Sequence, residues 1–130
     1  MVGIVVISHS EKIAEGLVEM ALQMAPNAPI IAAGGTNDGR IGTDIEKISE
    51  AIKSVYSNDG VVILFDLGSA YMNAEMAIDF LEDDIDKEKI EIIDSALVEG
   101  VITASVESSI GSSREGIKEA LKPLCLNKMP

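Results

Sequence analysis

The chain has a single histidine, His9, and this residue and Asp66 are the side chains best placed for chemistry. Each follows an apolar run of strand length, residues 2–7 before His9 and residues 61–65 before Asp66. A neutral imidazole is a good nucleophile toward phosphorus, and a carboxylate bonded to one ring nitrogen leaves the other free to attack. A helical pattern starts after each of these residues, and a helix N-terminus stabilises anions. The pair therefore predicts a site that holds a phosphohistidine.

The order of the strands decides whether these two side chains meet. Four apolar runs of strand length alternate with amphipathic helical patterns, at residues 2–7, 30–33, 61–65 and 90–93. The alternation predicts an α/β fold, a doubly wound and mostly parallel sheet of four to five strands with helices on both faces. The common strand order 2-1-3-4 places the first and third strands side by side at the topological switch point. We therefore expect residues 1–130 to form a single domain with His9 and Asp66 adjacent at one edge of the sheet.

Apolar stripes and capping pairs predict which face of each helix is buried and where each helix begins. Two buried stripes are expected, one at Ile13, Leu17, Met20, Ala21 and Met24 and one at Met72, Met76, Ala77, Phe80 and Leu81. The methionines are accordingly interpreted as core residues. Capping-box spacing pairs Ser8 with Glu11, Thr43 with Glu46 and Ser112 with Glu115, and Ser10 is a second candidate cap for the first helix.

A glycine-rich loop follows the second strand, with glycines at Gly34, Gly35, Gly39 and Gly42. Such a backbone takes positive φ angles or approaches another group closely. The loop lacks the Lys-Ser/Thr pair of a P-loop and does not match G-x-G-x-x-G. In the strand order 2-1-3-4 it closes the site from the far side of the first strand. Both contact with phosphate and a merely flexible connection are open interpretations of this loop.

Composition limits the classes of function. The 130 residues are 47% hydrophobic but only 3% aromatic, and the net charge of −12 argues against binding the backbone of DNA or RNA. No apolar stretch approaches the length of a membrane span, and the N-terminal run lacks the basic flank of a signal peptide. The single cysteine, Cys125, fits the cytoplasm, and one His with one Cys excludes a zinc site of the usual kind. We expect a cytoplasmic protein without a metal site.

Three motifs together resemble the IIA domain of the mannose class of the bacterial phosphotransferase system (PTS). They are residues 5–10 around His9, residues 35–43 in the glycine loop and residues 66–75 after the third strand. Within that family, the chain looks most like the members that serve dihydroxyacetone kinase. The resemblance spans the whole chain, and it implies a doubly wound α/β domain that usually forms a homodimer.

The resemblance also implies the roles of individual residues. His9 is the transient phosphoryl acceptor, and Asp66 orients its ring. Residues identified by position as walls of the site are Gly35, Thr36, Gly39, Gly42, Gly68 and Ser69. Arg40, the one basic residue of the glycine loop, is a candidate partner contact on the rim.

A phosphotransferase of this kind works between protein partners. The resemblance implies that the phosphohistidine carrier protein HPr donates phosphate to His9. The phosphoryl group then passes to ADP held by the nucleotide-binding subunit of the kinase, whose ATP phosphorylates dihydroxyacetone on a third subunit. No cofactor belongs to this chain itself, because any Mg²⁺ would accompany the nucleotide.

Several alternatives stand beside this interpretation. His9 is also explained as a solvated loop residue, and Asp66 as a cap of the following helix. A IIA component of a sugar permease would use the same chemistry and donate to a IIB domain, although such relatives usually carry a Gly-Gly-Ser-Pro-like turn where this chain has Asp66-Leu-Gly-Ser-Ala. A flavin or nucleotide binder would need more aromatic residues and a phosphate loop after the first strand. A response-regulator receiver, with Asp66 as phosphoacceptor, would need an acidic pair where this chain has Ser8 and His9.

Overall fold

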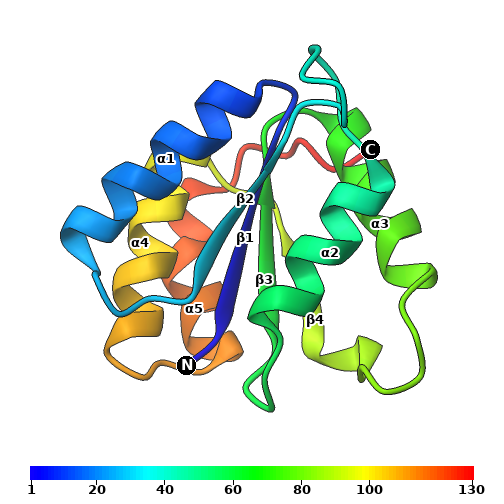
Figure 1. Ribbon diagram of the computed structural model, residues 1–130. Coiled ribbons are helices and arrows are strands. Elements are labelled where there is room, and N and C mark those ends of the chain that lie inside the picture. Colours follow the sequence, from blue (N-terminus) through cyan, green and yellow to red (C-terminus); the bar gives the residue numbers. More distant parts are fainter.

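The sheet has four strands, all parallel, in the order β2-β1-β3-β4. The computed structural model describes all residues, 1–130. The strands are β1 (Gly3–Ser8), β2 (Ile30–Gly34), β3 (Val61–Phe65) and β4 (Ile90–Ile93). The predicted strand order is therefore confirmed, with four strands rather than five. Figure 1 shows β1 and β3 side by side in the middle of the sheet.

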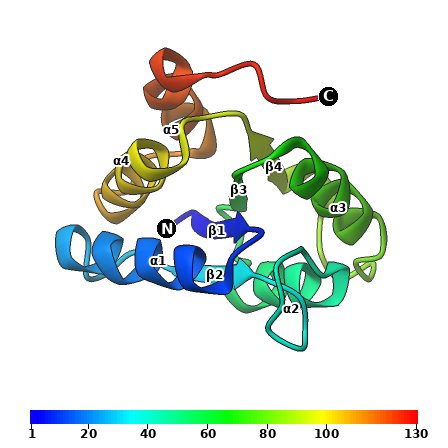
Figure 2. The same ribbon diagram turned by 90° about the horizontal axis from the view of Figure 1, so that it is seen from above.

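Helices cover both faces of the sheet, as the alternation of elements predicts. One face carries α1 (Glu11–Met24), α4 (Leu97–Ser109) and α5 (Arg114–Leu121). The other carries α2 (Ile45–Val55) and α3 (Gly68–Asp79). Seen from above in Figure 2, the sheet lies as a central layer between these two groups. There are two short 3₁₀ helices. One, η1 (Lys87–Lys89), leads directly into β4, and the other, η2 (Lys122–Leu124), follows α5.

The two central strands are buried along their whole length because helices cover both of their sides. Successive side chains of a strand point to opposite faces. Val5 and Ile7 of β1 pack with the core of α2 and α3, whereas Ile4 and Val6 pack with the core of α1, α4 and α5. This two-sided burial explains why both strands have continuous apolar sequences rather than alternating ones.

The predicted buried faces of α1 and α3 are partly wrong. In α1 the sheet is contacted by Ala14, Leu17 and Ala21, whereas Ile13 and Met24 are more than half exposed. In α3 the buried residues are alanines, and the side chains expected in the core but found exposed are Met72, Met76 and Phe80. Both helices have two adjoining stripes of apolar residues, so periodicity alone does not choose between them.

Close packing decides that the stripe of small residues faces the sheet. A Cβ added to Gly34 of β2 would lie 2.7 Å from the Cβ of Ala14, so the helix and strand approach as closely as an alanine and a glycine permit. A longer side chain at position 14 would push α1 away from the sheet. The interpretation of the methionines as core residues is therefore wrong, because all four on these helices are exposed: Met20, Met24, Met72 and Met76.

Three of the predicted helix caps are shifted by one or two residues. The N-caps are Ser10 for α1, Asp44 for α2 and Ser113 for α5, and each accepts a hydrogen bond from a backbone N–H of the first turn. Ser10, the second candidate for α1, is thus confirmed and the pairing of Ser8 with Glu11 is wrong. Ser8 still belongs to β1, and its hydroxyl bonds Asp66 instead.

Candidate functional site

His9 and Asp66 meet above the carboxyl ends of β1 and β3. The two strands are neighbours with Ile7 opposite Phe65, so the chain segments that leave them emerge side by side. His9 Nδ1 lies 2.9 Å from Asp66 Oδ1, and both side chains are about one-fifth exposed. The expected proximity of these two residues is therefore a feature of the structure.

The carboxylate of Asp66 is held by four hydrogen bonds from groups close to it in space. Oδ2 accepts from the Ser8 hydroxyl at 3.0 Å and from the His9 backbone N–H at 2.9 Å, and Oδ1 accepts from the Leu67 N–H at 2.7 Å as well as from the ring. Burial alone would raise the pKa of Asp66, but the hydrogen bonds from His9, Ser8 and Leu67 outweigh it and lower this pKa. The group is therefore a fixed anion at neutral pH. It is not the N-cap of α3, because that position is Leu67.

The other ring nitrogen of His9 points toward the first turn of α3. Nε2 lies 2.7 Å from the hydroxyl oxygen of Ser69. Because the anionic Asp66 accepts a hydrogen bond at Nδ1, the proton of a neutral ring sits there, and Ser69 then donates to the lone pair of Nε2. The first amides of a helix have no acceptor within the helix and attract anions. The arrangement therefore leaves Nε2 as the basic nitrogen, next to groups that suit a phosphoryl group.

The glycine loop is bonded to the backbone around His9. The Gly35 N–H donates to Ser8 O at 3.1 Å, and the Gly42 N–H donates to His9 O at 2.8 Å. Gly35, Gly39 and Gly42 all have positive φ. A Cβ at Gly35 would also lie 3.1 Å from the Cβ of Glu11, which leaves little room for a side chain. These glycines therefore hold a tight turn against His9 and the start of α1, which argues against a merely flexible connection.

Thr36 and Arg40 occupy the outer part of this loop. The Thr36 hydroxyl donates to Asp38 at 2.5 Å and accepts from the Arg40 N–H at 3.0 Å, so it is used within the turn. The Arg40 guanidinium pairs with Asp38 at 2.9 Å and is 80% exposed. Neither side chain contacts His9 by a hydrogen bond or ion pair. Arg40 projects outward, where a docking protein can reach it.

One residue of this region was not anticipated from the sequence. Lys47, in the first turn of α2, donates from Nζ to Gly34 O at 2.7 Å and to Thr36 O at 3.4 Å, and it lies 3.7 Å from Glu11 Oε2. It joins the base of the glycine loop to the beginnings of two helices. The sequence carries no signal for this role, because a lysine on a helix is ordinarily solvated.

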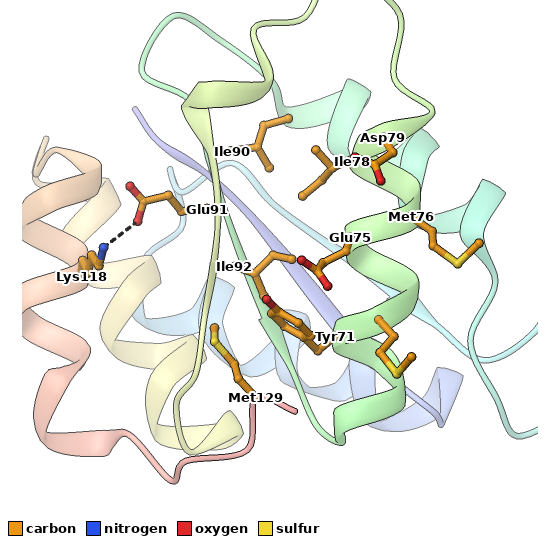
Figure 3. A pocket seen from close by; sticks show the side chains of 11 residues that line it. Tyr71, Glu75, Met76, Ile78, Asp79, Ile90, Glu91, Ile92, Lys118 and Met129 are labelled. Carbon is orange, nitrogen blue, oxygen red and sulfur yellow. Dashed lines mark ion pairs between the residues drawn. The ribbon is translucent and has the colours of Figure 1, made fainter.

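The largest surface hollow lies away from His9. Its volume is about 670 Å³, and it lies between α3 and β4, lined by residues including Tyr71, Glu75, Ile92 and Lys118. Figure 3 shows these side chains around it, with Lys118 paired to Glu91. His9 and Asp66 do not line it. No helix combines the length and the apolar character of a membrane span, and no cluster of three or more metal-ligating side chains is present.

Comparison with known proteins agrees with the fold and with the family that the sequence motifs indicate. Residues 3–118 match the family described as the PTS system fructose IIA component, EIIA-man, and the chain belongs to this family. It is 43% identical over 122 residues to the "PEP-dependent dihydroxyacetone kinase 2, phosphoryl donor subunit DhaM" of Listeria innocua, covering 93% of this chain and 97% of that relative. It is 38% identical over 126 residues to the "PTS-dependent dihydroxyacetone kinase, phosphotransferase subunit DhaM" of Lactococcus lactis, covering 97% and 98%. A solved protein of unknown function, EF1359, is 31% identical with a TM-score of 0.82, covering 95% of this chain and 94% of that one.

Proposed function

We propose that this chain is a phosphoryl carrier that accepts phosphate on His9 from HPr and passes it to ADP bound on the nucleotide-binding subunit of dihydroxyacetone kinase. The observation that carries the proposal is the fixed ring of His9, with Nδ1 held by Asp66 and Nε2 turned toward Ser69. The names of the Listeria and Lactococcus relatives, phosphoryl donor and phosphotransferase subunits of that kinase, support the choice of acceptor. The chain would act in the cytoplasm as a homodimer.

The accepting step follows from the tautomer of His9. The Nε2 lone pair attacks the phosphorus of the donor's phosphohistidine, so that an N–P bond forms at Nε2 as the donor's N–P bond breaks. The departing imidazole keeps the electron pair of that bond, and the Nδ1 proton stays on His9 beside Asp66. Ser69 then turns its hydroxyl from Nε2 to a phosphoryl oxygen. Transfer of this kind depends on positioning and charge stabilisation, which the fixed ring and the first turn of α3 supply.

The second step needs a partner that brings its own nucleotide. A terminal phosphate oxygen of ADP attacks the phosphorus on His9, which releases the imidazole and forms ATP. The glycine loop is tied to the backbone of Ser8 and His9 and its Arg40 pairs with Asp38, so the loop does not form a nucleotide cradle. A chain with a net charge of −12 also repels free ADP. We therefore assign ADP and its Mg²⁺ to the opposing subunit.

The test of this function uses the phosphorylated protein, prepared with HPr and freed of donor. Free ADP and Mg²⁺ should leave the phosphate on His9, whereas addition of the ADP-loaded nucleotide-binding subunit should remove it and yield ATP in equal amount. Labelled phosphate and a luciferase assay for ATP measure both quantities. ATP formation from free ADP alone would contradict the assignment of the nucleotide to the partner.

The second candidate is a IIA component of a sugar permease, and the description of the matched family as a fructose component favours including it. The same phosphorylated protein distinguishes the two functions. Suppose the phosphate is transferred to a sugar-permease IIB domain and not to the ADP-loaded subunit. That result would support the phosphohistidine intermediate and contradict the assignment of the kinase subunit as the acceptor. The named relatives lead us to expect the opposite result.

Arg40→Ala should slow the reaction with the protein partners by roughly three- to ten-fold without changing the fold, because a rim charge acts mainly on association rates. Arg40 is 80% exposed and its only ion pair is with its neighbour Asp38. Lys53→Ala is the matched control, since it also removes one positive charge. Lys53 lies near the end of α2, and this end packs against the start of β1, so it is at the opposite end of the strands from His9. Stopped-flow transfer rates at several salt concentrations measure the effect. Equal rates for the two variants would remove Arg40 from the docking surface.

A further inference from the structure

A segment near the end of the chain is folded onto the same edge of the sheet as His9. Asp94, which follows β4, is 9% exposed and accepts backbone hydrogen bonds from Leu126 at 3.2 Å, from Met129 at 2.8 Å and from Lys128. Asn127 has a left-handed backbone, φ 56°, which allows these N–H groups to converge on one carboxylate. Residues 126–129 are therefore pinned at a defined place rather than projecting into solvent. In Figure 1 this last part of the chain lies close to the start of α3.

The pinned segment places the side chain of Lys128 against β3, the strand that precedes Asp66. Its Nζ donates to Phe65 O at 2.8 Å and lies 4.8 Å from the centre of the Phe65 ring. The ladder between β3 and β4 ends with Leu64 opposite Ile93, so the Phe65 carbonyl is the first one beyond it. The ammonium of Lys128 thus takes the place that a longer β4 would fill. This carbonyl belongs to the peptide group that joins Phe65 to Asp66.

The main chain of the segment also covers the turn between Asp66 and α3. A Cβ added to Gly68, the first residue of α3, would lie 3.5 Å from Lys128 O. Burial lowers the pKa of Lys128, and the nearby carboxylates of Asp94 and Asp66 oppose this shift without cancelling it. The bond from Lys128 to the carbonyl of the Phe65–Asp66 peptide group places the charges of Lys128 and Asp66 near each other. Lys128 is thus a partly buried cation next to the residue that orients His9.

We propose that Lys128 is a positioning residue of the phosphoryl site, which fixes the Phe65–Asp66 peptide and offsets the negative charge that arrives with the phosphate. The inference rests on the proposed phosphorylation of His9. A phosphoryl group brings between one and two negative charges next to the carboxylate of Asp66. In a chain of net charge −12, the cation held at Phe65 O favours the phosphorylated form by offsetting that repulsion.

The test measures the equilibrium between phosphorylated HPr and this protein for three variants. Lys128→Met should lower the equilibrium constant for phosphorylation about five-fold, the effect of losing about 1 kcal/mol of charge interaction at a partly exposed site. Lys128→Arg keeps the charge and should restore the constant to within about two-fold of the wild-type value. The control is Lys122→Met, which removes an equally positive side chain that is 65% exposed and pairs with Glu119. Its equilibrium constant should match that of the wild type.

A fourth variant weakens the contacts of Asp94 with residues 126–129 and leaves the side chain of Lys128 unchanged. Asp94→Asn should weaken the bonds that hold residues 126–129 and shift the equilibrium in the same direction as Lys128→Met, by a smaller factor. Wild-type equilibrium constants for both Lys128→Met and Asp94→Asn would overturn the inference, as would failure of arginine to rescue while circular dichroism shows a native fold. If the wild-type protein accepts no phosphate at all, the proposed function fails instead, so the two failures are distinct.

Discussion

His9→Ala should take up no phosphate from phosphorylated HPr, whereas the wild-type protein should gain one phosphoryl group. The chain has no second histidine, so no other imidazole can replace the Nε2 nucleophile. The loss should exceed about a thousand-fold, because removing the nucleophile removes the bond-forming atom itself. Intact-protein mass spectrometry measures the added mass, and peptide mapping gives its position.

The stability of the bound phosphoryl group in acid and in base distinguishes a phosphohistidine from a phosphoserine, which the serine hydroxyls of the site could also form. A phosphoramidate is hydrolysed in acid and survives in base, whereas a phosphoserine behaves in the opposite way. Ser69 lies 2.7 Å from Nε2 and Ser8 contacts Asp66, so both hydroxyls are available for comparison. Ser69→Ala is the matched control and should still be labelled, since its hydroxyl only assists. An acid-stable label, or one that persists in His9→Ala, would exclude His9 as the acceptor.

The parts of the fold that follow from the sequence are those set by continuous burial. β3 and β1 up to Ile7 are continuously apolar because helices cover both faces, and this pattern together with the common order 2-1-3-4 predicts them as central neighbours. The proximity of His9 and Asp66 then follows from topology, since parallel neighbours end at the same edge of a sheet. The central pair of the candidate site was thus predictable without a structure.

The features that were not predicted depend on contacts between residues distant in sequence. The exposure of Ile13 and Met72 reflects which of two apolar stripes approaches the sheet, and that is decided by the space around small residues such as Gly34. Lys47 and Lys128 hold backbone carbonyls around the site through hydrogen bonds from their ammonium groups. Neither lysine lies in a local sequence pattern that distinguishes it from a solvated lysine. The cap of α1 likewise lies at Ser10, two positions after Ser8, because the Ser8 hydroxyl bonds Asp66 instead.

Asp66→Asn tests whether the carboxylate orients the ring, and it should slow phosphoryl acceptance by roughly two or more orders of magnitude. An asparagine has nearly the same shape, so an amide oxygen in the place of Oδ2 can keep the bonds from the Ser8 hydroxyl and the His9 backbone N–H while the fold persists. The amide nitrogen then takes the place of Oδ1, where the Leu67 N–H loses its acceptor. The negative charge is lost, however, and if the amide nitrogen faces Nδ1 it donates there and moves the ring proton to Nε2. That tautomer has no lone pair on Nε2 and cannot attack phosphorus.

The size and the nature of the defect distinguish this role from simple capping. A helix cap contributes about 1 kcal/mol of stability, so a variant that only lost a cap would unfold more easily while its transfer rate stayed near the wild-type value. α3 has Leu67 at its N-cap and no side-chain capping bond, which already argues that the helix does not depend on Asp66. We therefore expect thermal unfolding of Asp66→Asn to stay close to that of the wild type and its rate of labelling to fall. Nitrogen-15 spectra of the ring, which separate the two tautomers, should show the proton on Nδ1 in the wild type and a larger share on Nε2 in the variant. A rate within a few-fold of the wild type, with an unchanged tautomer, would leave Asp66 without the orienting role.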